Sequence, residues 1–316
     1  MAPARFRAWL FPLLAVLLAA TGGCFGGGHA VGDPATGPVP IGRSSQIIEW
    51  GGISRKFDLY RPQGLAGPAA LVVMMHGGFG NSAQAERSYH WDAQADKADT
   101  GHFLVMYPDG HHRAWNAGSC CGMPQQDNID DVGFIAAAVA ALGRRIPIDQ
   151  SRIYATGMSN GAMMALRLAC ETEMFAAVAP VAGTLVTDCS RARPTSVLQI
   201  HGTDDQSVPY NGGPGKALKS NGTPRVNGPG IPAVAATWRV IDGCRPPTST
   251  TAGVVTTETA ACPSGRAVQL ISVAGAGHQW PGSERGPLAD LLGAAEPSKA
   301  LDATDTVWRF FGRHHR

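Results

Sequence analysis

Apolar runs of strand length alternate along the chain with segments whose apolar residues recur at helical spacing. Two of the runs, AALVVMM and FLVMY, lack charged residues, which is typical of strands buried on both faces of a parallel sheet. The runs cover residues 69–75, 103–107, 152–156, 176–180, 196–200 and 268–273, and the helical segments cover residues 129–145, 160–170, 231–241 and 301–311. This alternation predicts a single α/β domain over residues 45–316 with a doubly wound, mostly parallel sheet.

Two further segments depart from that alternation. Residues 46–61 hold two strand-like pieces around Gly51-Gly52, which predicts an opening hairpin. Residues 206–232 are rich in Gly, Pro, Asn and Lys and are too long for a simple connection. They follow a predicted strand directly, so we interpret them either as a substrate-binding loop or lid, or as a disordered or surface excursion.

The N-terminal residues have the pattern of an export signal. Arg5 and Arg7 precede the apolar run 8–20, and small residues follow up to Cys24. A run of about 13 apolar residues is too short to span a bilayer comfortably. We therefore predict an export signal over residues 1–23 and a flexible tether over residues 24–44.

Cys24 is a candidate site for a lipid that would anchor the exported chain to a membrane. A cysteine directly after two small residues is the position that bacteria lipidate, but Thr21 stands where such signals usually carry Leu. The sequence leaves a lipid anchor at Cys24 and free secretion as alternatives. No later segment is apolar enough for a membrane helix, so any membrane attachment would depend on that lipid.

Composition limits the class of partner. The chain is 44% hydrophobic and 16% charged with a formal net charge of +2, which is ordinary for a globular protein and gives no reason to expect a polyanionic partner. No basic run with interleaved aromatic residues is present, so nucleic-acid binding is not expected.

The seven cysteines predict disulfides, because the chain is expected to be exported. Setting Cys24 aside leaves an even number. Cys244 pairs with Cys262 across a Thr-rich segment, and Cys170 pairs with Cys189. The adjacent residues Cys120 and Cys121 either form a vicinal disulfide or stay reduced. No Cys-x-x-Cys pair with matching histidines exists, so a zinc site is not expected.

The segment Gly157-Met158-Ser159-Asn160-Gly161 carries the strongest chemical signal. A strand-like run precedes it and a helical segment follows it. Glycines on both sides permit a sharp strand-to-helix turn that exposes a serine hydroxyl at the edge of the sheet. Ser159 is therefore the predicted nucleophile, and the start of the helix adds positive potential where an oxyanion would form.

A serine nucleophile needs a histidine base that a carboxylate orients. In α/β proteins with such a strand-to-helix serine turn, the three residues follow along the chain in the order Ser, acid, His. His278 lies in a glycine-rich loop after the last predicted strand, whereas the later histidines stand at the extreme C-terminus. The acid is Asp204 or Asp205, which spacing barely separates. Asp242 is a weaker third candidate, because it lies at the end of a predicted helix.

The oxyanion hole requires two backbone N–H groups. We expect one from Asn160 and the other from the glycine-rich segment His76-Gly77-Gly78-Phe79-Gly80, with Gly78 first and Phe79 second. Trp115, Tyr210 and Trp280 either line a pocket for the substrate or fill the core. Nothing in this chemistry calls for a metal or a cofactor.

These motifs together resemble the esterase family that groups bacterial feruloyl esterases with polyhydroxybutyrate-depolymerase-like enzymes, including actinobacterial esterase lipoproteins. The resemblance runs in order from about residue 45 to the C-terminus, and its motifs include HGG at 76–78, YPDG at 107–110, WN at 115–116, CC at 120–121, DDVGF at 130–134, GMSNG at 157–161, HGT at 201–203 and GH at 277–278. It implies an α/β-hydrolase fold, Asp205 as the acid, and Asp130-Asp131 as structural. It also implies ester substrates with a hydroxycinnamate or a short hydroxyalkanoate acyl group.

Three functions remain open on this basis. The first is hydrolysis of carboxylic esters through an acyl-enzyme formed on Ser159. Transfer of the acyl group to a sugar or lipid hydroxyl uses the same intermediate. A surface binding protein that keeps the fold without catalysis is the third.

Overall fold

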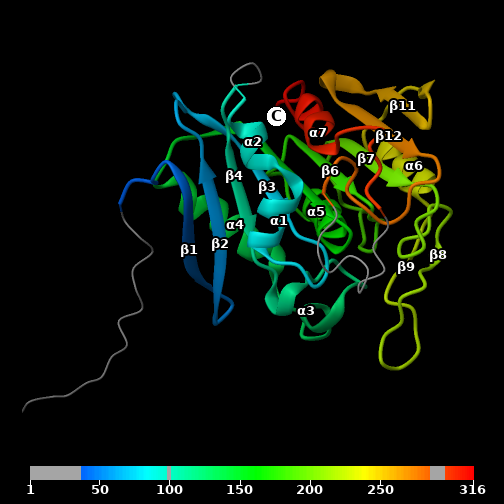
Figure 1. Cartoon of the computed structure of the whole chain (residues 1–316), viewed down its shortest axis with the longest axis horizontal. Coiled ribbons are helices and arrows are strands. Elements are labelled where there is room, and N and C mark those ends of the chain that lie inside the picture. The colour runs from blue at the N-terminus through cyan, green and yellow to red at the C-terminus, as the bar shows by residue number, and fades with distance from the viewer. Residues whose placement is uncertain (1–36, 98–100, 285–295) are drawn as a thin grey trace, which may run out of the picture. The chain divides into compact units, whose positions relative to one another are not determined.

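A ten-stranded sheet forms the centre of the computed structural model, which describes residues 37–97, 101–284 and 296–316 (Figure 1). Its strand order is β1-β2-β4-β3-β5-β6-β7-β12-β11-β10. The predicted export signal, Cys24 and the first part of the predicted tether lie outside the described residues. Among the described residues, no helix is long and apolar enough to cross a bilayer.

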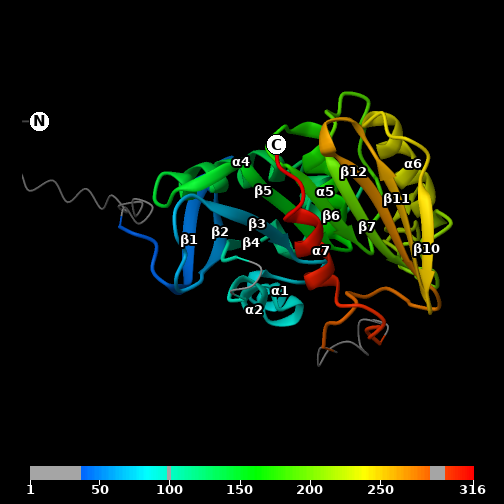
Figure 2. The ribbon, with the colours of Figure 1, turned by 90° about the horizontal axis from the view of Figure 1, so that it is seen from above.

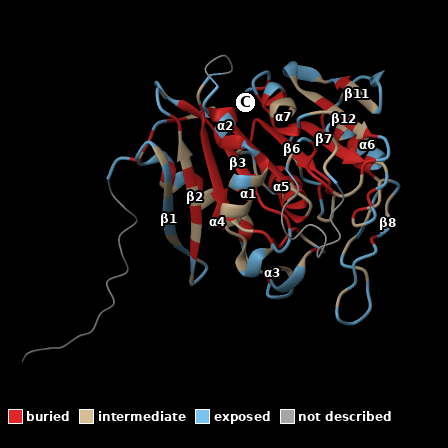
Figure 3. Cartoon of the chain, in the orientation of Figure 1, coloured by how far each residue is buried: buried red, intermediate tan, exposed pale blue. Residues whose placement is uncertain are grey.

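The central strands are parallel and the edge strands are antiparallel. The parallel strands are β3 (Ala69–Met75), β4 (Leu104–Pro108), β5 (Ile148–Met158), β6 (Ala177–Val181), β7 (Ser196–Gly202) and β12 (Ala267–Val273). The antiparallel edges are β1 (Gly42–Trp50) with β2 (Ile53–Arg61), and β10 (Thr248–Ala252) with β11 (Val255–Ala261). Most residues of the central strands are buried (Figure 3).

Helices cover both faces of the sheet (Figure 2). On one face lie α4 (Asp131–Gly143), α5 (Asn160–Glu171) and α6 (Ile231–Ile241), and on the other lie α1 (Ser82–Tyr89), α2 (Trp91–Ala95) and α7 (Ala303–Phe311). Strand β3 shows why both faces need cover, since Leu71 and Val73 pack on the first face and Val72 on the second. A doubly wound sheet that carries a serine turn at the end of β5 is the α/β-hydrolase fold.

The shorter elements lie in the connections. They are α3 (Gly122–Gln126), the 3₁₀ turns His111–Arg113 and Pro263–Gly265, and the paired strands β8 (Gly213–Pro214) and β9 (Asn227–Gly228). The last two belong to the segment 206–232, which forms an ordered projection from the end of β7 (Figure 1). The segment has defined structure, so it is not a disordered stretch, whereas a substrate-binding loop or lid and a surface excursion both stay open.

The hydrophobic pattern missed several elements, among them the hairpin strands β10 and β11 and the helices α1 and α2. Strands β10 and β11 form the Thr-rich hairpin between Cys244 and Cys262, and β10 is exposed along its whole length. A strand without a buried face has no apolar alternation, so only the β-branched threonines could have indicated it. Helices α1 and α2 are too short for a clear helical period.

The structure contains both predicted disulfides and, of the two alternatives for the adjacent cysteines, the vicinal disulfide. They connect Cys170 with Cys189, Cys244 with Cys262, and the adjacent residues Cys120 and Cys121.

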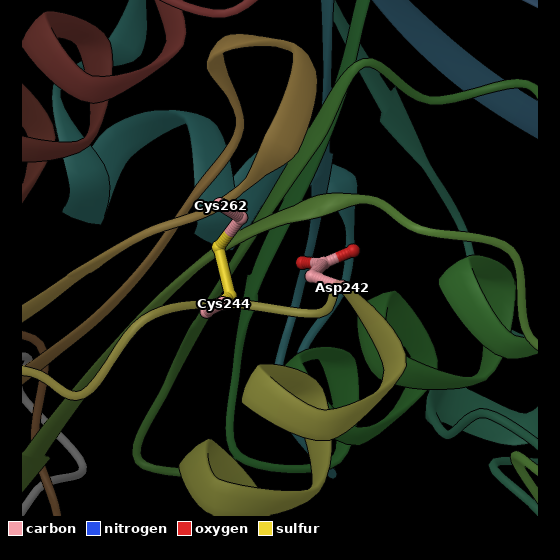
Figure 4. A group of neighbouring side chains, drawn as sticks. All are labelled: Asp242, Cys244 and Cys262. Carbon is pink, nitrogen blue, oxygen red and sulfur yellow. A yellow bond between two sulfur atoms is a disulfide. The ribbon is translucent and has the colours of Figure 1, made fainter.

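Cys244 and Cys262 also lie beside the Asp242 carboxylate, within 4.8 Å (Figure 4). Because the two sulfurs are bonded to each other, they are not thiolates, which are the form that binds a metal. This cluster is therefore a cross-link that joins the end of α6 to the end of β11.

Candidate active site

Ser159 lies in a tight turn between β5 and α5. Its backbone has φ 57° and ψ −117°, a conformation that non-glycine residues rarely adopt and that costs energy. The flanking glycines are required by space: a Cβ on Gly157 would lie 2.5 Å from Gly161, and a Cβ on Gly161 would lie 2.4 Å from Met75 O. The turn therefore needs both glycines, and it presents the Ser159 hydroxyl at the carboxyl edge of the sheet.

His278 connects Ser159 to Asp205 through two hydrogen bonds. Nε2 of His278 lies 2.8 Å from Ser159 Oγ, and Nδ1 lies 2.7 Å from Asp205 Oδ2. The imidazole is partly exposed, with 17% of the side chain accessible, whereas the Asp205 carboxylate is fully buried. Each of the two hydrogen bonds thus joins residues more than 70 positions apart in the sequence.

Burial raises the pKa of the Asp205 carboxyl, but hydrogen bonds from His201 and His278 outweigh it and hold that pKa well below its ordinary value. Oδ1 of Asp205 also accepts from the backbone N–H of Ser207 and Val208, each at 2.8 Å. The carboxylate is ionised at neutral pH, so Nδ1 of His278 carries the proton and Nε2 offers its lone pair to Ser159.

Asp204 has a different environment from its neighbour. Its side chain is exposed, and it accepts only a hydrogen bond from Thr203 Oγ1 at 3.2 Å. The geometry therefore separates the two aspartates that spacing could not, and Asp205 is the one beside the histidine. Asp242, the third candidate, lies at the end of α6 beside a disulfide and contacts the Thr195 amide instead.

The loops that carry the acid and the histidine are bonded to each other. The Asp204 amide donates to Ala276 O at 2.9 Å, and the Gly275 amide donates to Thr203 Oγ1 at 2.9 Å. Gly202 has no room for a side chain, since a Cβ there would lie 2.2 Å from Ala276 O. These contacts hold the end of β7 against the loop after β12, which fixes the separation of Asp205 and His278.

Two backbone amides beside Ser159, those of Asn160 and Gly78, have no hydrogen-bond acceptor among the described residues, as an oxyanion hole would require. Asn160 is the first residue of α5, so its N–H has no acceptor within the helix. Gly78 lies next to it, because a Cβ on Gly78 would be 4.0 Å from the Asn160 Cβ. The Phe79 amide, the second choice from sequence, instead donates to Arg113 O at 2.8 Å. Phe79 is thereby removed as a donor, and Gly78 with Asn160 remain.

Trp115 joins the two segments that carry these amides. Its indole Nε1 donates to His76 O at 2.9 Å, and its backbone exchanges two hydrogen bonds with the Asn160 side chain. His76 in turn accepts from the Gly110 amide at 3.0 Å, and burial lowers the pKa of its imidazole. Trp115 is completely buried, so it supports the loop rather than presenting a surface to a ligand.

The other two aromatic residues also have structural contacts. Trp280 is 2% exposed, packs against Tyr89 with the two rings tilted by 33°, and donates from Nε1 to Thr304 Oγ1 at 3.1 Å. Tyr210 is half-buried, and its hydroxyl lies 2.6 Å from Ser272 Oγ. Trp115 and Trp280 were predicted either to line a substrate pocket or to fill the core, and their burial matches core filling.

A buried ion pair supports the site, and only one of its members stood out in the sequence. Arg55 Nη2 lies 2.6 Å from Asp131 Oδ1, and Asp131 Oδ2 accepts from the Asn116 amide at 2.7 Å. Arg55 also lies over the Phe134 ring at 3.9 Å. Asp131 belongs to the DDVGF motif that the resemblance implied to be structural, whereas a single arginine in a predicted strand carries no comparable signal.

Comparisons with known proteins agree with this arrangement. The family model described as Esterase PHB depolymerase matches residues 55–234. A protein named "Putative esterase NocK", from Nocardia uniformis subsp. tsuyamanensis, is 32% identical over 76% of this chain and 73% of its own length. Feruloyl esterase B of Piromyces equi is 31% identical over 71% of this chain, which spans 42% of that longer protein.

Among solved structures, the acetyl xylan esterase from Aspergillus awamori superimposes with a TM-score of 0.57. The match covers 85% of this chain and 99% of that one at 17% identity, so it shows a shared fold. The family model spans more than half of the chain, and it covers both the proposed nucleophile turn and the acid loop. The chain therefore belongs to the esterase PHB depolymerase family, and it is an esterase.

Proposed function

We propose that the protein hydrolyses carboxylic esters through an acyl-enzyme on Ser159. The observation that carries this proposal is the unbroken line of hydrogen bonds from Ser159 Oγ through His278 to Asp205. Nε2 of His278 takes the hydroxyl proton as Ser159 Oγ attacks the ester carbonyl, and the ionised Asp205 stabilises the imidazolium. The same proton then passes to the departing alkoxide.

The Gly78 and Asn160 amides stabilise the tetrahedral intermediate by donating to its oxyanion. The start of α5 adds the positive end of the helix dipole at the same place. Water then enters, His278 removes its proton, and its oxygen attacks the acyl carbon. Ser159 leaves with the proton returned by His278, and a carboxylic acid is released.

The relatives indicate the class of ester. They include a feruloyl esterase and a bifunctional acetylxylan esterase/xylanase, and the family name refers to a polyhydroxybutyrate (PHB) depolymerase. Our proposal is that the acyl group is a feruloyl, a short acyl or a hydroxyalkanoate group. A panel of these three esters, with product analysis in the presence of an alcohol, separates them and also distinguishes hydrolysis from acyl transfer.

Export of the chain is part of the proposal. Three disulfides among the described residues favour an oxidising compartment. The N-terminal pattern with Cys24 adds either a lipid anchor or free secretion. Mass spectrometry of the mature protein decides between them, because a diacylglyceryl group on Cys24 adds a characteristic mass.

Substitution of the nucleophile tests the mechanism. Ser159→Ala is expected to abolish hydrolysis of p-nitrophenyl butyrate and covalent labelling by a fluorophosphonate. Ser220→Ala, at an exposed serine in the segment 206–232, serves as the control and retains both. Full turnover in Ser159→Ala would refute the acyl-enzyme on this residue.

A further inference from the structure

The segment 206–232, here called the β7–α6 arm, is a basic element next to the proposed active site. It contains Lys216, Lys219 and Arg225 and no Asp or Glu. The side chains of Lys216 and Arg225 are exposed, and Lys219 is half-exposed. Within the described part of the chain, none of the three pairs with a carboxylate. The arm thus adds unneutralised positive charge to one side of the molecule.

The base of the arm is anchored close to the nucleophile. Thr184 Oγ1 donates to Pro229 O at 2.7 Å. The preceding residue, Gly183, lies against the nucleophile turn, since a Cβ there would be 3.0 Å from Ser159 O. The residue that holds the arm therefore directly follows a neighbour of Ser159 in the sequence.

The outer part of the arm contacts residues 76–80, here called the oxyanion loop because they include the proposed donor Gly78. The Arg225 guanidinium lies over the Phe79 ring, 4.9 Å from its centre, and Phe79 directly follows Gly78. Phe79 remains 54% exposed despite this contact. The ring is held toward solvent by a backbone with φ 66° and by the hydrogen bond from its amide to Arg113 O.

The strand order of the sheet shows which loops the Arg225–Phe79 contact joins. The oxyanion loop follows β3 and the arm follows β7, while β5 and β6 lie between these strands. Ser159 stands at the end of β5, so the Arg225–Phe79 contact joins loops on opposite sides of the nucleophile. The contact therefore lies at the same edge of the sheet as Ser159 and directly beside Gly78.

Arg113 adds a further cation on the same side. Its guanidinium Nε contacts only the Gly80 carbonyl, at 3.4 Å, and it makes no ion pair within the described residues. Arg225 likewise uses its Nε to donate to Leu218 O at 2.9 Å, which leaves its terminal nitrogens available. Terminal guanidinium nitrogens recognise carboxylates through paired hydrogen bonds.

We infer that Arg225, together with the neighbouring Arg113, forms an anion-recognising side of the substrate site, and that the enzyme favours esters that also carry a free carboxylate. This inference rests on the proposed function of Ser159 and extends it to a substrate class. The carboxylate belongs to a part of the substrate away from the scissile bond, because the oxyanion position is occupied by the reacting carbonyl.

A pair of acetate esters tests the inference. The anion 4-acetoxybenzoate and its neutral methyl ester have the same reacting acetyl group and differ in charge at the far end. In the wild-type protein, the ratio of kcat/KM for the anion to that for the neutral ester is expected to fall as NaCl rises from about 0.05 M to about 0.5 M. Arg225→Gln is expected to lower the ratio about threefold to fivefold, the range of one partly exposed charge pair.

The matched control is Arg144→Gln, which removes an exposed cation at the far end of α4, near the opposite edge of the sheet. This variant is expected to keep the wild-type ratio. An unchanged ratio in Arg225→Gln, or an equal fall in Arg144→Gln, would overturn the inference.

Binding separates this inference from the proposed function. The product anion 4-hydroxybenzoate is titrated calorimetrically into the wild type and both variants. If only the Arg225→Gln variant binds 4-hydroxybenzoate more weakly, anion recognition is supported. This holds even if neither ester is hydrolysed, a result that would contradict the proposed function but not the inference. Hydrolysis of both esters with equal binding of the anion by all three proteins supports the function and contradicts the inference.

Discussion

The side chain of Asn160 holds the backbone of Trp115 through two hydrogen bonds, one accepted by Oδ1 at 2.7 Å and one donated by Nδ2 at 3.0 Å. The Trp115 indole reaches His76 O on the other side. One buried tryptophan is therefore bonded to both segments that supply the proposed oxyanion donors. This relationship explains why a tryptophan in the middle of a loop has a structural role close to the chemistry.

Trp115→Phe is expected to lower kcat about fivefold to tenfold with little change in KM. Phenylalanine keeps most of the packing but loses the hydrogen bond to His76 O, which costs about 1 kcal/mol and loosens the loop before Gly78. Steady-state kinetics on a p-nitrophenyl ester measure the effect.

Trp280→Phe is the matched control for that substitution. It also removes a buried indole hydrogen bond, the one to Thr304 Oγ1. Both variants should lose similar stability in urea unfolding, but only Trp115→Phe should lose kcat. Equal losses of kcat would show that Trp115 acts through general stability.

Asp205→Asn is expected to lower kcat by roughly three to four orders of magnitude, because the amide no longer fixes the tautomer of His278 or stabilises its charged form. Asp204→Asn provides the comparison, since that side chain is exposed and does not contact the histidine. Its kcat should remain within about twofold of the wild type. A larger loss in Asp204→Asn than in Asp205→Asn would reverse the assignment of the acid.

Asp242 makes the stability of the protein depend on pH. Burial raises the pKa of its carboxyl to about 7, although the Thr195 amide and Arg266 act in the opposite direction. In the unfolded chain an Asp titrates near 3.9. The group therefore contributes most to stability below about pH 4, and this contribution is lost as the pH rises toward about 7.

Asp242→Asn removes this titration while keeping an oxygen to accept from Thr195. Relative to the wild type, the variant should gain stability as the pH increases from 4 to 7. Urea unfolding of both proteins at about pH 5 and pH 8 measures the difference. A stability difference that stays constant across this window would contradict the raised pKa.

The buried pair of Arg55 and Asp131 should show strong coupling. Asp131→Asn alone leaves the Arg55 charge buried without its partner, which is expected to cost about 3–5 kcal/mol of unfolding free energy. Arg55→Met combined with Asp131→Asn removes both charges and retains an acceptor for the Asn116 amide. The double variant should be more stable than Asp131→Asn, and additive losses would argue against a coupled pair.

Much of the fold could be predicted from the sequence because its signals are local. The apolar run at Ala69–Met75 corresponds to β3 without any shift of its ends, and the segment Ile231–Ile241 matches α6. Buried strands and amphipathic helices leave a period in the chain itself, since each side chain faces a fixed direction. The exposed strand β10 left no such period, and the contacts within the sheet decide its structure.

For the site, the sequence by itself determined which residue types are present and their order, with Ser159 before Asp205 and Asp205 before His278. The choice of Asp205 over Asp204 required the family resemblance, and the structure supports it independently, because Asp205 is buried and hydrogen-bonded to His278. Only the tertiary structure showed that the Phe79 amide is bonded to Arg113 and that Trp115 is buried. It also brought Arg225 over Phe79. Such contacts depend on how loops from separate strands meet at one edge of the sheet, and no local pattern of residues encodes that meeting.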